Sequence, residues 1–260
     1  MEIKGIKKFK EYFGKNENQY VLIGGVACSL LLNDAGLDFR TTKDFDIVII
    51  IEALDESFGR EIWKFINDGE YEIRQRSNNK PVFYRFKNPK NNMFPSELKL
   101  FSKSNFILEN SIMPIYISDD VSSLSAILLD DDYYEFLKTG LSNIDDIQIL
   151  NYTHLIPFKI KAWLDLSKRK NDGEEIDSKK INKHKNDVLR LSQLLNNVKI
   201  ETSDSIKNDI RTFVSYIEKE KIDYSQLKIT GSLTKTLDKI KELYLLWLSF
   251  IKIIKLENIQ

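Results

Sequence analysis

The chain has 260 residues, of which 42% are hydrophobic and 30% charged, and its formal net charge is zero. This composition is ordinary for a globular protein, and no apolar run reaches the roughly 18 residues that a bilayer-spanning helix needs, which excludes a membrane partner. The N-terminus lacks the continuous apolar segment of a secretory signal, so a cytoplasmic protein is expected. The single cysteine, Cys28, lies in an apolar helical pattern and is predicted to be a core thiol.

The charge is divided unevenly along the chain. Residues 151–260 hold 21 Lys and Arg against 15 Asp and Glu, a net charge of +6, and residues 1–150 carry the compensating −6. An acidic part facing a basic part suits a cleft in which carboxylates hold metal and lysines meet phosphate. Two solvated surfaces with no shared role explain the same charges equally well.

The first part of the chain alternates helical and extended patterns. A basic helix, a short apolar strand, a second helix and a β-branched strand are expected in turn over residues 4–13, 20–23, 24–37 and 45–51. A third helix and four short strands follow over residues 56–67, 71–75, 82–86, 97–101 and 112–117. This order predicts an α+β fold for residues 1–150, with a mixed β-sheet flanked by helices.

The second part of the chain is predicted to be helical. All five prolines fall between positions 81 and 157, and beyond them only Gly173 and Gly231 interrupt the sequence. Apolar residues recur at three-to-four spacing, which predicts helices over residues 153–169, 179–196, 203–219 and 233–255. We therefore expect a C-terminal α-helical domain over residues 151–260.

The sharpest local feature is a pair of carboxylates, Asp44 and Asp46, at the start of the second strand. Residues two apart on a strand point to the same face, so both acids project together while Phe45 enters the core. Adjacent carboxylates repel each other unless a cation lies between them, and Mg²⁺ is a cation that such ligands bind. Alternatively, the two acids only end a strand at a solvated edge.

A glycine pair, Gly24 and Gly25, separates the first strand from the second helix. Glycines there allow backbone amides and the helix N-terminus to approach a phosphate, although a plain strand-to-helix turn is equally consistent with them. Arg40 and Thr42 flank the entry to the second strand and are placed to contact phosphate or to orient the aspartates. For Arg40 the alternative is a surface ion pair. Neither a P-loop nor a dinucleotide-binding glycine motif occurs in the chain.

The Gly-Gly turn, the helix and the Asp-x-Asp strand together resemble the nucleotidyltransferase superfamily of the DNA polymerase beta type. More narrowly, Tyr20-Val-Leu-Ile-Gly-Gly-Val-Ala and Phe39-Arg-Thr-Thr-Lys-Asp-Phe-Asp-Ile are similar to the AbiEii toxin-type nucleotidyltransferases and their bacterial relatives. The similarity continues in Phe83-Tyr-Arg-Phe, in Pro157-Phe-Lys-Ile-Lys-Ala-Trp-Leu-Asp-Leu and in Lys183-His-Lys-Asn-Asp-Val. In the last segment, His184 stands where the family often has an acid.

The resemblance implies a reaction and its cofactors. A nucleoside triphosphate would bind at Gly24 and Gly25, and Mg²⁺ or Mn²⁺ would be held by Asp44 and Asp46. A third carboxylate, Glu97, would help to deprotonate an acceptor hydroxyl, and pyrophosphate would leave. In the helical part, Lys159 and Lys161 are candidate ligands of the triphosphate, together with His184 and Asp187. For His184 and Asp187 the alternative is an ordinary surface pair.

The chain departs from the family at the third acid, because Lys99 stands at the acid position. Glu97 lies two residues earlier, on the same strand face, and either substitutes for that acid or leaves the site without one. Pairing of Lys99 with the aspartates would replace a second metal by a fixed charge and would favour nucleotide binding over catalysis.

The leading hypothesis is therefore a Mg²⁺-dependent nucleotidyltransferase that acts on an RNA, protein or small-molecule hydroxyl. The resemblance further suggests transfer RNA or a protein as acceptor, a role as a toxin or in phage defence, and a cognate antitoxin as partner. The rival is a catalytically inactive module that binds a nucleotide or a partner. A nucleic-acid-binding protein is a weaker reading, because the lysines of the helical part alternate with acids.

Overall fold

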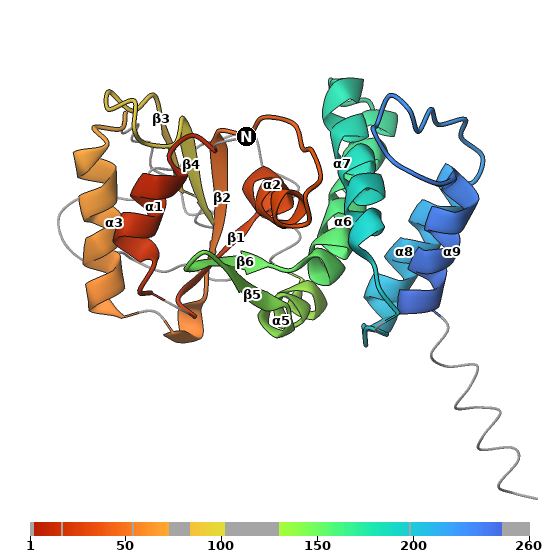
Figure 1. Cartoon of the computed structure of the whole chain (residues 1–260), viewed down its shortest axis with the longest axis horizontal. Helices are drawn as coiled ribbons and strands as arrows, with labels where there is room; N and C mark the ends of the chain where they lie inside the picture. Colours follow the sequence, from red (N-terminus) through yellow and green to blue (C-terminus); the bar gives the residue numbers. More distant parts are fainter. Residues whose placement is uncertain are drawn as a thin grey trace, which may run out of the picture. The chain divides into compact units, whose positions relative to one another are not determined.

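The computed structural model describes residues 3–16, 18–53, 55–72, 84–101, 130–197 and 199–245 (Figure 1). The chain divides into two compact units, Met1–Asn151 and Tyr152–Gln260, next to the division expected after residue 150. The expected strand at 112–117 lies outside the described residues, as does the end of the expected helix at 233–255. Within the described ranges, no helix is both long enough and apolar enough to cross a membrane.

The described part of the first unit is an α+β fold with a six-stranded mixed sheet, in the order β3-β4-β2-β1-β6-β5. Its strands are β1 Tyr20–Ile23, β2 Asp44–Ile49, β3 Tyr84–Lys87, β4 Glu97–Phe101, β5 Leu141–Ile144 and β6 Ile147–Leu150. Its helices are α1 Ile6–Phe13, α2 Gly24–Asp34, α3 Glu56–Asp68 and α5 Asp131–Thr139, with a short 3₁₀ helix at Ile51–Ala53. The mixed sheet flanked by helices that the sequence predicted is confirmed at this level.

Strand β2 lies between β4 and β1 in the sheet. It pairs antiparallel with β1 and parallel with β4, and β4 pairs antiparallel with the edge strand β3. On the other side of β1, the β5–β6 hairpin joins the sheet through a parallel pairing of β6. Of the strand expected at 71–75, the structure describes Tyr71 and Glu72, and Glu72 forms an isolated bridge with Lys87; residues 73–75 lie outside the described residues.

The two faces of the sheet have different surroundings. Helices α1 and α3 lie on one side of β2 and β4, and α2 lies on the other (Figure 1). The face toward α1 and α3 is apolar and rich in aromatic side chains: Phe13 lies 4.7 Å from Phe9 and 5.2 Å from Phe65 between ring centroids. Such ring contacts add about 0.5–1.5 kcal/mol each to the free energy of burial.

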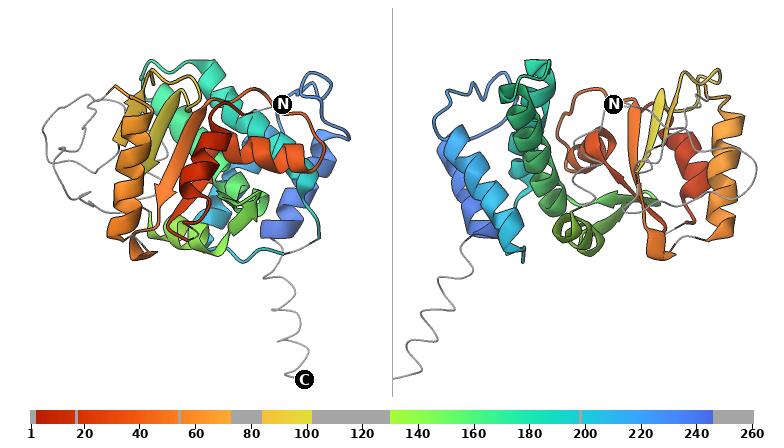
Figure 2. Two further views of the ribbon diagram at one scale, coloured as in Figure 1. Left: turned by 60° about the vertical axis from the view of Figure 1, so that its left-hand side comes forward. Right: turned by 180° about the vertical axis from the view of Figure 1, so that it is seen from behind.

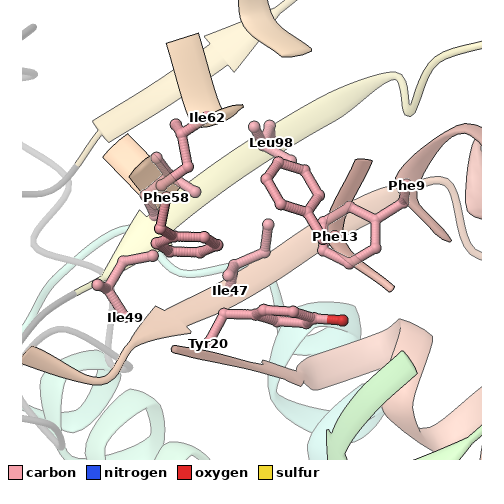
Figure 3. A pocket seen from close by; sticks show the side chains of 9 residues that line it. Phe9, Phe13, Tyr20, Ile47, Ile49, Phe58, Ile62 and Leu98 are labelled. Carbon is pink, nitrogen blue, oxygen red and sulfur yellow. The ribbon is translucent and has the colours of Figure 1, made fainter. Parts of the chain in front are cut away.

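A small cavity of about 10 Å³ remains in this aromatic core (Figure 3). Its lining is entirely apolar: Phe9, Phe13, Tyr20, Ile47, Ile49, Phe58, Ile62, Leu98 and Leu100. A cavity of this size and polarity offers no partners to water or to a polar ligand. The charged side chains of β2 and β4 project from the opposite face of the sheet.

The second unit is built from helices that run alongside one another (Figure 2). They are α6 Tyr152–Asn171, α7 Ser178–Leu191, α8 Asp204–Ile217 and α9 Leu233–Tyr244, with a 3₁₀ turn at Ser192–Leu194. Trp163 of α6 packs edge-on against Phe213 of α8 at 5.3 Å between ring centroids. Within the described residues, helices are thus present in each of the four segments for which the sequence predicted them, and α7 ends at Leu191, before the expected residue 196.

Pro157 lies inside α6 and removes one backbone donor from it. In a regular helix the N–H of residue 157 would reach the carbonyl of Thr153, which the proline ring prevents. The hydroxyl of Tyr244, from α9, donates to this carbonyl at 2.5 Å instead. Burial raises the pKa of the Tyr244 hydroxyl well above its usual value, so it remains a donor.

Candidate functional site

The polar face of β2 carries Asp44 and Asp46, both partly exposed, while Phe45 between them is fully buried. Strand alternation therefore places the two carboxylates on one face, as the sequence predicted. Asp44 has no hydrogen bond or close ion pair with any residue that the structure describes. It is a carboxylate of this face that a ligand can engage without first displacing another side chain.

The glycine turn lies directly against the second of these acids. Ile23 is paired with Asp46 in the β1–β2 register, so Gly24 begins α2 beside the Asp46 carboxylate. A Cβ atom built on Gly24 would overlap Asp46 Oδ2, and the φ of Gly24 is +70°, in the left-handed region. Glycine at 24 is therefore required both by the backbone conformation and by the close approach of the acid.

The loop before β2 also reaches the start of α2. A Cβ atom built on Gly25 would lie 2.7 Å from Thr42 Oγ1 and 3.4 Å from Arg40 Nη2. The N-cap residue of α2, Ile23, makes no side-chain hydrogen bond to the first turn, and this end of a helix carries partial positive charge. The structure thus brings the two glycines, Arg40, Thr42 and Asp46 together at one place.

The neighbouring strand contributes a cation at the position where the sequence analysis expected a third acid. Lys99 of β4 lies in register with Asp46, and its Nζ donates to Asp46 Oδ1 at 3.0 Å. The same Nζ lies 3.5 Å from Glu97 Oε1. Burial alone would lower the pKa of Lys99, but the negative charges of Asp46 and Glu97 outweigh burial and raise the pKa, so the ammonium stays charged.

Glu97 is held by cations from two strands. Arg85 of β3 donates to both of its carboxylate oxygens, from Nε at 2.5 Å and from Nη2 at 3.0 Å. Lys87 lies 3.9 Å from the same carboxylate. Burial alone would raise the pKa of Glu97, but the Arg85 hydrogen bonds and the charges of Lys99, Arg85 and Lys87 lower it.

This arrangement does not support the role predicted for Glu97. A carboxylate whose two oxygens are engaged by a bidentate arginine is a poor metal ligand and a poor proton acceptor. Among the described residues, no group of three or more His, Cys, Asp or Glu side chains is gathered as a metal site would require. Asp44 and Asp46 do fit a single Mg²⁺, since this ion is often bound through one or two carboxylates together with substrate phosphates.

Arg85 and Lys87 are the charged residues of this face that the sequence did not single out. The segment around Arg85 contributed to the family resemblance, but the strand expected there ended at residue 86. In the structure β3 extends to Lys87, so Arg85 and Lys87 lie on the same face of it. Their role as partners of Glu97 depends on the pairing of β3 with β4. No local sequence signal specifies that pairing.

The candidate residues of the helical part belong to the second unit. Asp187 of α7 is fully buried, and its Oδ2 accepts from Nζ of the buried Lys159 of α6 at 2.8 Å. Lys161 is instead paired with Asp209 of α8 at 2.7 Å, and His184 is partly buried on α7. Lys159 and Asp187 thus join two helices inside this unit, a role that spacing along the sequence did not indicate.

Comparison with protein-family models, with curated proteins and with solved structures finds no match for this chain. The function must therefore be argued from the residues of the site.

Proposed function

We propose that the first unit binds a nucleoside triphosphate with Mg²⁺ and transfers its nucleotidyl group to an acceptor hydroxyl. The observation that carries this proposal is the position of Asp46 against Gly24 at the uncapped start of α2, with Asp44 on the same strand face. The N-terminus of α2, which can bind an anion, thus adjoins two carboxylates that can bind a cation. A metal-bound triphosphate needs both.

The chain's own residues have distinct tasks in this reaction. The amides at Gly24 and Gly25 and the guanidinium of Arg40 hold the phosphates, and Asp44 and Asp46 hold the ion. The ion supplies charge neutralisation of the phosphate oxygens when it is bound. The acceptor oxygen forms a bond to the α-phosphorus, the bond from that phosphorus to the bridging oxygen breaks, and pyrophosphate leaves. The hydroxyl proton passes to Asp44, because Glu97 is already held by Arg85.

The acceptor and the biological setting are proposed from the resemblance alone. A hydroxyl of transfer RNA or of a protein is the proposed acceptor, with a small molecule as the remaining class. A toxin or phage-defence role would bring a cognate antitoxin as partner.

One set of contacts favours a second candidate function, nucleotide binding without transfer. Lys99 already neutralises Asp46, and Glu97 is unavailable as a third carboxylate. A site with these contacts would retain a metal-bound nucleotide but lack the groups that accelerate transfer.

The test incubates the full chain with α-phosphate-labelled nucleoside triphosphates, Mg²⁺, and total cellular RNA and protein. We expect the native chain to transfer label and Asp46→Asn to lower the transfer by at least about 100-fold. Mutation of residues that only hydrogen-bond to metal ligands already lowers metal affinity or activity by up to about 100-fold. Asp34→Asn, at the exposed far end of α2, makes the same charge change and should leave transfer unaltered.

Calorimetry on the same proteins separates the two candidates. Nucleotide binding that depends on Mg²⁺ and on Asp46, without transfer to any acceptor, would establish the binding module instead. If neither binding nor transfer occurs, or if Asp46→Asn leaves both unchanged, the proposed site is wrong.

A further inference from the structure

We infer that Lys99 occupies the place of a second metal ion, so that this site takes a single divalent cation with its nucleotide. The inference rests on the proposed function and specifies its metal requirement. In two-metal phosphoryl-transfer sites the ions lie about 3.5–4 Å apart and share carboxylates. Here a protein side chain supplies the second positive charge.

The position of the Lys99 ammonium carries this inference. Lys99 is the register partner of Asp46 on the adjacent parallel strand, and its Nζ lies between two carboxylates, 3.0 Å from Asp46 and 3.5 Å from Glu97. Its side chain is only 22% exposed, so solvent screens the ammonium poorly. A second divalent ion that bridged Asp46 to β4 would have to enter this same space, against the repulsion of a partly buried positive charge.

Two of the three acids on this face are already paired with basic side chains. Strands β2, β3 and β4 place three acids and three bases on it: Asp44, Asp46, Glu97, Arg85, Lys87 and Lys99. The set is neutral before any metal binds. Asp46 is paired with Lys99 and Glu97 with Arg85, so a second divalent ion would have to displace a basic side chain from one of these carboxylates.

The experiment counts Mn²⁺ ions bound per chain by electron paramagnetic resonance, in the presence of a non-hydrolysable nucleoside triphosphate. We expect a single ion in the native chain. In Lys99→Asp, a carboxylate stands in register with Asp46, and we expect a second ion to bind. Lys87→Asp is the matched control, because it makes the same charge change on the same face. Residue 87 lies on the edge strand β3 and pairs with Glu97 rather than with Asp46, so this variant should still bind a single ion.

Thermal unfolding provides a readout that does not depend on activity. Lys99→Asp removes a partly buried ammonium that lies within 3.5 Å of two carboxylates, whereas Lys87 lies 3.9 Å from Glu97 and its side chain is 44% exposed. Lys99→Asp should therefore unfold at a lower temperature than Lys87→Asp without metal. It should also gain more from Mn²⁺, because ligands that bind only the folded state stabilise it. Should Lys99→Asp fail to fold, Lys99→Met removes the ammonium without adding an acid. It should bind a single Mn²⁺ more tightly than the native chain does.

Several results would overturn the inference while leaving nucleotide binding intact. These are a second ion in the native chain, nucleotide bound without any ion, and a single ion in folded Lys99→Asp. If the native chain binds neither nucleotide nor Mn²⁺, the proposed function itself fails and the inference fails with it.

Discussion

Gly24 determines how closely the start of α2 approaches the carboxylate of Asp46. Its φ of +70° is costly for any residue with a Cβ atom, and the space that a Cβ would need is filled by the Asp46 carboxylate. Gly36, just beyond the end of the same helix, has a φ of +72°, but a Cβ atom added there would meet nothing within 4 Å. The two glycines therefore share a conformation and differ only in what surrounds them.

A comparison of Gly24→Ala with Gly36→Ala distinguishes the cost of backbone strain from damage to the site. We expect Gly24→Ala and Gly36→Ala each to lower the free energy of unfolding by about 1–2 kcal/mol through the left-handed conformation. Only Gly24→Ala should also displace Asp46 and abolish nucleotide binding. Urea unfolding and calorimetry measure the two effects. Equal nucleotide affinity in both variants would show that Asp46 does not depend on the glycine.

At the scale of secondary-structure elements, a hydrogen bond from α9 reaches a carbonyl of α6 whose usual helical donor is missing because of Pro157. The carbonyl of Thr153 loses its helical donor to the proline, and the fully buried Tyr244 hydroxyl replaces it. A buried carbonyl left without a donor costs roughly 1–3 kcal/mol. One hydrogen bond thus contributes to the packing of two helices that are far apart in the sequence.

A double-mutant cycle tests this compensation. Tyr244→Phe should lower the free energy of unfolding by about 1–3 kcal/mol in the native background. In a Pro157→Ala background the restored N–H can satisfy Thr153, so the same substitution should cost clearly less. Chemical denaturation of the four proteins gives the coupling energy. A coupling close to zero would mean that the hydroxyl does not substitute for the missing helical donor.

At the scale of the whole molecule, the buried His154 makes stability depend on pH. Burial lowers its pKa from 6.5 to about 4. Between these values the unfolded chain binds a proton that the folded chain does not, so stability falls as pH drops from 6.5 toward 4. The full loss of unfolding free energy across this window is on the order of 3 kcal/mol. Above pH 6.5 His154 causes no such loss.

Unfolding measured across this pH range provides the test. His154→Gln should lose the part of the pH dependence that lies between 4 and 6.5, whatever its absolute stability. His184→Gln, which alters the only other histidine of the chain, retains His154 and is expected to keep that slope. If the two variants show the same slope, His154 is not the group responsible.

The sequence alone predicted several features that depend on residues close together in the chain. The helices of the second unit follow from apolar spacing, and the projection of Asp44 and Asp46 from one strand face follows from their separation by a single residue. The β5–β6 hairpin was missed. Its two-residue turn uses Asp145 and Asp146, with φ of 51° and 59°, rather than the Asn-Gly sequence that usually marks such a turn.

Only the tertiary structure decided which charges meet. Asp46 and Lys99 are 53 residues apart, and their contact depends on the parallel register of β2 and β4. The capture of Glu97 by Arg85 depends in the same way on the pairing of β3 with β4. Strand register between distant segments is set by the packing of the whole sheet, which no short stretch of sequence encodes. The amino-acid pattern therefore identified a pair of acids beside a glycine turn and a lysine at the position expected for a third acid. The fold determined that this lysine contacts Asp46 and that Arg85 holds Glu97.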